Sequence, residues 1–160
     1  MSEAVSLGEF ASMIEGKEEG EVEKLVKSGA KFQGYTVMMI AAMHTNGTWV
    51  LSHFSKSDPS TINEYATETL SGLADTLQLD VDENIRTDTH FTPLMLAVMF
   101  GPPASVKTLL DAGAATGMQT KSGYTAKMFS TCRNDESIQE YFKGNSRKFC
   151  SAYWGACSMM

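Results

Sequence analysis

The residue types that perform metal or nucleophilic chemistry are few in this chain and widely spaced. The histidines, His44, His53 and His90, lack the spacing of a helical zinc motif. Cys150 and Cys157 are separated by six residues, which is wider than a zinc knuckle. The sequence therefore predicts no metal site and no cofactor.

Catalysis by a nucleophile needs a base that is oriented beside it, and the sequence places none next to Cys132. The chain also lacks the glycine-rich loop that cradles nucleotide phosphates and the nucleophile elbow of hydrolases. We therefore expect that the protein is not an enzyme.

The elements that would position binding side chains recur along the chain. Thr92 and Pro93 are suited to start a helix, because the threonine side chain caps free N–H groups and proline has no N–H to lose. Gly101 ends this helix and Gly113 ends the next one. Thr125 follows Thr92 by 33 residues. The segment resembles an ankyrin repeat, whose period is also 33 residues. The matching residues are Phe91, Thr92, Pro93, Leu94, Met95, Leu96, Ala97, Gly101, Val106, Leu109, Leu110, Gly113 and Ala114.

The resemblance implies an all-α, mainly helical fold, a solenoid of helix-turn-helix units joined by short hairpin loops. An ankyrin repeat domain is expected over residues 1–144, followed by a C-terminal tail over residues 145–160. The expected repeats are residues 5–30, 34–85, 86–118 and 119–144.

An insertion is expected in the second repeat, because Thr36 and Thr92 are 56 residues apart. Apolar residues at three- and four-residue steps predict an amphipathic helix over residues 60–79, which would serve as an enlarged second helix. Its acidic side chains are expected to be solvated. The side chains expected to pack on the stack are Ile62, Tyr65, Leu70, Leu73 and Leu77.

In ankyrin proteins, as the resemblance implies, partners contact the hairpin tips and the groove-facing end of each first helix. An aromatic residue precedes each capping threonine, and aromatic and arginine side chains often dominate binding energy. The alternative is that these aromatic residues stack on each other and stiffen the array. The expected groove residues are Tyr35, Met43, His44, Phe91, Met99, Phe100, Tyr124 and Arg133.

Charge and composition restrict the partner. A formal net charge of −6 repels nucleic acid and anionic membranes. No apolar stretch approaches the roughly 20 residues of a membrane span. Three cysteines at irregular positions do not form a disulfide framework and fit a reducing compartment. We therefore expect a monomer in the cytoplasm, with the nucleus as an alternative, that binds neither nucleic acid nor membrane.

The sequence thus predicts a protein-protein interaction module or adaptor that binds another protein through the concave ankyrin groove. The alternative is a regulatory or inhibitory subunit, or a short isoform, of a larger enzyme or signalling assembly. Fold alone does not separate the two roles, because the function of a repeat scaffold lies in its surface.

Overall fold

The computed structural model of the protein describes residues 5–57, 59–133 and 135–142; the expected tail over residues 145–160 lies outside them. Helices dominate these residues, and two short strands form a hairpin. The elements in chain order are α1 (Leu7–Glu15), α2 (Glu19–Ser28), β1 (Lys31–Phe32), β2 (Tyr35–Thr36), α3 (Val37–Met43), α4 (Thr48–Ser57), the 3-10 helix η1 (Pro59–Asn63), α5 (Ser71–Leu77), α6 (Glu83–Arg86), α7 (Pro93–Phe100), α8 (Pro103–Asp111), α9 (Ala126–Cys132) and α10 (Glu136–Glu140).

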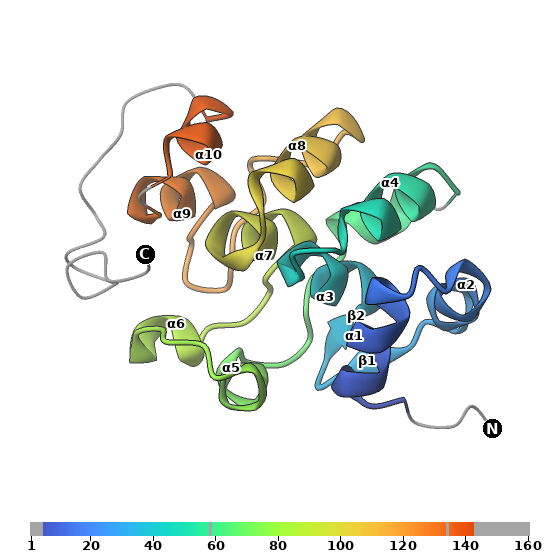
Figure 1. Ribbon diagram of the computed structural model, residues 1–160. Helices are drawn as coiled ribbons and strands as arrows, with labels where there is room; N and C mark the ends of the chain where they lie inside the picture. Colours follow the sequence, from blue (N-terminus) through green and yellow to red (C-terminus); the bar gives the residue numbers. More distant parts are fainter. Residues whose placement is uncertain (1–4, 58, 134, 143–160) are drawn as a thin grey trace.

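Helix pairs follow one another in a row, as Figure 1 shows for α1–α2, α3–α4, α7–α8 and α9–α10. The first helix of a pair packs on the first helix of the next, so that α3 contacts α7 and α7 contacts α9. Second helices do the same, since α4 contacts α8. The prediction of a mainly helical repeat fold is confirmed.

Helix α7 lies at the centre of the packing because its sequence is apolar on every side. Each residue from Pro93 to Met99 is buried, as expected for a helix without a polar face. At its end, a Cβ atom on Gly101 would overlap the carbonyl oxygen of Ala42. Glycine therefore allows the ends of α3 and α7 to approach closely. The core continues from Phe10 in α1 to Ile138 in α10.

The insertion differs from its prediction. The second helix of the second pair is α4, and residues 60–79 do not form one helix. They comprise the end of η1, an irregular segment over residues 64–70, and α5. Thr67 and Thr69 are poor helix formers, and the Thr67 N–H instead donates to the Gly34 carbonyl oxygen at 3.3 Å.

Burial within the insertion follows the prediction only in part. Leu70 and Leu73 are fully buried and Ile62 is nearly so, as expected. Tyr65 and Leu77 were expected to pack, but their side chains are 42% and 39% exposed. The change in backbone direction after η1 accounts for Tyr65, because a helical spacing no longer places it on the face of Leu70 and Leu73. Leu77 shares a face of α5 with Leu73 but is the last residue of that helix.

The insertion lies on the same side of the stack as the β1–β2 hairpin, with α5 and α6 beneath α3 and α7 in the view of Figure 1. The hairpin itself is minimal: Lys31 pairs with Thr36 and Phe32 with Tyr35 in antiparallel register. Its turn residues, Gln33 and Gly34, both have positive φ. The insertion therefore contacts the hairpin on the side of the stack where a repeat protein without an insertion would expose its hairpins.

Candidate partner-binding face

The first helices begin in the same way in three successive pairs. The hydroxyl oxygens of Thr36, Thr92 and Thr125 each accept a hydrogen bond from the backbone N–H three residues later, at 3.3 Å. This is N-capping, which satisfies a free N–H of the first turn. The residues just before these threonines consequently occupy equivalent places in the stack.

The aromatic side chains at these places are not equally accessible. Tyr35 and Phe91 have 0% exposure, whereas Tyr124 is half-buried. Phe91 and Tyr124 both approach Phe129 in α9, with ring centroids 6.2 Å and 5.9 Å apart. Both side chains therefore lie in the core of the described structure, and their role in partner binding stays a prediction.

The insertion covers the Tyr35 side chain and also bonds to the backbone of Phe91. The Tyr35 O–H donates to the Glu68 carbonyl oxygen at 3.4 Å, and the Ala66 N–H donates to the Phe91 carbonyl oxygen at 2.8 Å. Burial raises the pKa of the Tyr35 hydroxyl, and the negative charges of Asp88 and Glu68 raise it further. The sequence analysis did not predict this contact. The short hairpin before Thr36 was a signal of it, because a short hairpin leaves space that another segment can fill.

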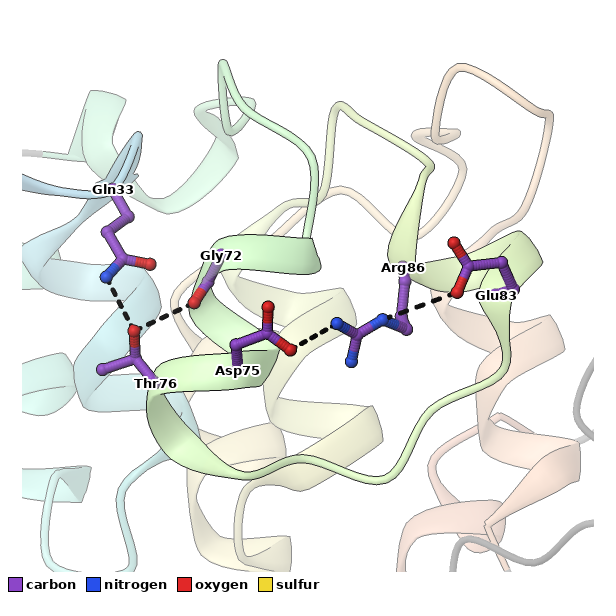
Figure 2. A network of polar contacts seen from close by, with 6 residues as sticks. All are labelled: Gln33, Gly72, Asp75, Thr76, Glu83 and Arg86. Carbon is purple, nitrogen blue, oxygen red and sulfur yellow. Dashed lines mark hydrogen bonds and ion pairs between the residues drawn. The ribbon is translucent and has the colours of Figure 1, made fainter.

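Polar contacts continue from the hairpin into the insertion (Figure 2). The Gln33 amide donates to the Thr76 hydroxyl at 2.7 Å, and this hydroxyl donates to the Gly72 carbonyl oxygen at 2.9 Å. Farther along, the Arg86 guanidinium lies between the carboxylates of Asp75 and Glu83 (Figure 2). These contacts join the hairpin to α5 and α5 to α6.

The far ends of the first helices hold the next group of predicted residues. Met43, His44 and Phe100 are half-buried, so each keeps some accessible surface. His44 Nδ1 accepts from the Asn46 N–H at 3.0 Å. Met99 is only 3% exposed, and its role as a groove residue stays a prediction.

Arg133, also a predicted groove residue, binds within the protein. One terminal nitrogen of its guanidinium donates to the carbonyl oxygens of Ala97 at 3.3 Å and Val98 at 3.2 Å, and also to that of Gly101. These carbonyls lie at the C-terminal end of α7, where free acceptors and the helix dipole favour a cation. Burial lowers the pKa of Arg133. The side chain therefore joins two repeats and is not a free partner anchor.

Asp88 lies at the C-terminal end of the insertion and bonds it to another part of the stack. Its Oδ1 accepts from the N–H groups of Thr89 at 2.9 Å and Ser122 at 3.1 Å, which ties the end of the insertion to the loop before α9. Its Oδ2 is buried and has no hydrogen-bond partner among the described residues. A buried carboxylate so arranged strengthens the negative field around the Tyr35 hydroxyl.

Metal binding and membrane insertion are two further kinds of function on which the described residues bear. Within it, no three His, Cys, Asp or Glu side chains gather as a metal-binding group. Across the same residues, no helix combines the length and apolar character needed to cross a membrane. Cys132 takes part in a disulfide bond, and Cys150 and Cys157 lie outside the described residues.

Comparison with known proteins bears on the central helix pair. Residues 89–121, which contain α7 and α8, match the family described as Ankyrin repeat. This part of the chain is an ankyrin repeat. The helix pairs on either side of it follow the same packing of first helix on first helix. The resemblance predicted from Thr92, Pro93 and Gly101 is thus confirmed.

A solved structure shares the fold over most of the chain. The match is to a chain in the complex of a predatory endopeptidase from Bdellovibrio bacteriovorus with an immunity protein, with a TM-score of 0.50 and 20% identity. It covers 84% of this protein and 61% of the matched chain. At this identity the likeness establishes the fold of the repeats alone. No curated protein matches in sequence.

Proposed function

We propose that the protein is an interaction module, or adaptor, whose partner is another protein that contacts the first helices of the stack. The observation that carries this proposal is the ankyrin repeat at residues 89–121, set within a row of similarly packed helix pairs. Repeat stacks offer extended surfaces of this kind for binding. The matched solved chain is itself part of a complex of two proteins, which supports a binding role.

The side chains best placed for the partner are Phe100 and Tyr124, with Met43 and His44 beside the end of the preceding first helix. All four are half-buried, so they combine an accessible surface with a fixed position. Large aromatic side chains contribute much binding energy because they bury rigid area at small entropic cost. Within this proposal, residues 1–144 act as one monomeric domain.

A second candidate role is that of an inhibitory subunit. It is favoured by the matched complex, which joins an endopeptidase and an immunity protein. The two roles differ in their consequence for the partner. An inhibitory subunit would lower the activity of a bound enzyme, whereas an adaptor would leave that activity unchanged.

Affinity capture with the intact chain and with a Phe100→Ala, Tyr124→Ala double variant tests the proposal. A captured partner should lose at least about 2 kcal/mol of affinity for the variant, the cost typical of interface hot spots. Truncation of Tyr141, which is 38% exposed in the segment after α10, is the matched control and should leave affinity unchanged. Assay of the captured partner with and without the chain then separates inhibitor from adaptor.

The melting temperature of each variant decides how a loss of binding is interpreted. Hot-spot side chains are buried mainly in the complex, so their truncation should reduce binding while changing the melting temperature little. Affinity that falls only in proportion to the unfolded fraction would contradict the proposed face.

A further inference from the structure

The segment over residues 64–90 covers the Tyr35 side chain and bonds to the backbone of Phe91. At its start, Ala66 N–H donates to the Phe91 carbonyl, Thr67 N–H to the Gly34 carbonyl, and the Tyr35 O–H to the Glu68 carbonyl. At its end, Asp88 and Thr89 accept from the N–H groups of Ser122 and Lys121 in the loop before α9. The two bonds to the hairpin, those of Thr67 and Tyr35, are 3.3 Å and 3.4 Å long, at the outer limit of hydrogen bonding. The contact with the hairpin is therefore specific in position but is weakly held by these bonds.

The polar network drawn in Figure 2 adds little to this attachment. The contact between Gln33 and Thr76 is exposed. The carboxylates on either side of Arg86 are also largely in water, since the side chains of Asp75 and Glu83 are 72% and 78% exposed. Exposed polar contacts of this kind exchange readily with water and contribute little net stability.

The apolar anchorage of the segment is small for its length. Its fully buried large side chains are Leu70, Leu73 and Ile85, whereas α7 buries seven consecutive residues. Ordering each residue costs about 1–2 kcal/mol of conformational entropy, so a long segment with few buried apolar side chains opens at a lower free energy than the core.

Charge weakens the closed state further. Residues 64–90 contain seven of the 19 acidic residues of the chain and one basic residue, Arg86, so the segment is strongly negative. Like charges held together destabilise a compact arrangement. Release of the segment separates these charges in solvent.

From this geometry we propose that residues 64–90 are a cover that opens independently of the helix pairs and, on opening, exposes the Tyr35 side chain and releases the Phe91 carbonyl. A partner that binds the hairpin side of the stack then has to displace the cover, so the closed protein is autoinhibited at this surface. Only the autoinhibition of partner binding rests on the proposed function. The opening is a property of the chain itself and is measured without a partner.

Gly34 provides a wedge with a matched control. A Cβ atom at Gly34 would overlap the side chain of Glu68 and lie 3.1 Å from its backbone nitrogen, whereas one at Gly123 would meet nothing within 4 Å. Both glycines have positive φ, at 86° and 96°. Gly34→Ala and Gly123→Ala therefore share the cost of backbone strain, and only Gly34→Ala pushes on the cover.

Amide hydrogen exchange of the full chain, followed by NMR, measures opening. In the parent protein, the amides of Ala66, Ala74 and Ile85 should exchange at least about tenfold faster than that of Leu96 in α7, because local opening needs less free energy than global unfolding. Gly34→Ala should accelerate the cover amides by at least another tenfold or so relative to Leu96. Gly123→Ala should leave the ratio of cover to core rates unchanged.

Equal exchange rates for Ala66 and Leu96 in the parent, or equal acceleration of both by Gly34→Ala, would overturn the proposal, because the cover would then be part of the cooperative core. If Gly34→Ala does not fold, Gln33→Ala is the second variant. It removes one hydrogen bond and should accelerate amide exchange by about fivefold in the cover alone. Failure to capture a partner would leave these rates unchanged, so the two proposals fail separately.

Discussion

At the scale of single residues, Arg133 shows how a side chain suited to an interface is used within the fold. Its guanidinium reaches from the end of α9 to the carbonyl oxygens of Ala97, Val98 and Gly101 at the end of α7. A long cationic side chain satisfies acceptors that the helix cannot satisfy itself. Arg133 therefore links adjacent repeats.

We predict that Arg133→Met lowers the free energy of unfolding by about 1.5–3 kcal/mol, the range for hydrogen bonds to charged groups. Urea denaturation measures the change. Arg86→Met is the control: its partners are exposed carboxylates, so its loss should cost less than about 1 kcal/mol. Equal losses for the two variants would show that the carbonyl contacts of Arg133 do not stabilise the stack.

Residue types and spacing predicted where the caps lie but not which aromatic side chains are accessible. Thr92 and Thr125 cap their helices as expected, because a cap depends on neighbours in the sequence. The burial of Tyr35 depends on a contact with Glu68, 33 residues along the chain, and no local pattern specifies the path of that segment. Local rules therefore identified the positions and missed the cover of Tyr35.

At the scale of elements, the insertion shows that apolar periodicity can predict which side chains are buried without predicting a continuous helix. Leu70 and Leu73 were correctly expected in the core, although the helix predicted to carry them begins only at Ser71. Apolar spacing reports which side chains seek burial, whereas Thr67 and Thr69 disfavour a continuous helix. The irregular segment instead bonds to the backbone of the hairpin, where the Thr67 N–H donates to the Gly34 carbonyl oxygen.

We predict that Leu73→Asp destabilises the insertion by at least about 2 kcal/mol, since it places a charge where an apolar side chain is fully buried. Leu77→Asp, four residues later on the same helix, is the control. Leu77 is 39% exposed, so its substitution should cost about 0.5 kcal/mol or less. Exchange protection of the Ala74 amide reports both effects, and equal protection in the two variants would contradict the observed orientation of α5.

At the scale of the whole molecule, the helix pairs before and after the insertion are joined by direct packing between them and by the insertion that connects them. First helices contact first helices along the row, so each repeat depends on its neighbours. The 33-residue spacing predicted this part of the architecture. It did not predict that the extra residues would cover the hairpin side, because an insertion has no counterpart in the repeat pattern.

The charge of the insertion and the burial of Tyr35 together predict how the molecule responds to alkaline pH. Burial, followed by the negative charges of Asp88 and Glu68, raises the pKa of Tyr35 in the folded protein. In the unfolded chain, a tyrosine ionises near pH 10, at about its usual pKa. The folded state then holds a proton that the unfolded state releases.

The contribution of Tyr35 is therefore complete below about pH 10 and is lost as the pH rises from there toward the raised pKa, by up to about 1.4 kcal/mol per pH unit. Tyr35→Phe keeps the buried ring and removes the ionisation. We predict that the stability difference between parent and Tyr35→Phe is constant at neutral pH and shifts in favour of the variant above about pH 10. Urea denaturation at several pH values measures it. A difference for Tyr35→Phe that stays constant through the alkaline range would mean that the cover already admits water to the Tyr35 hydroxyl.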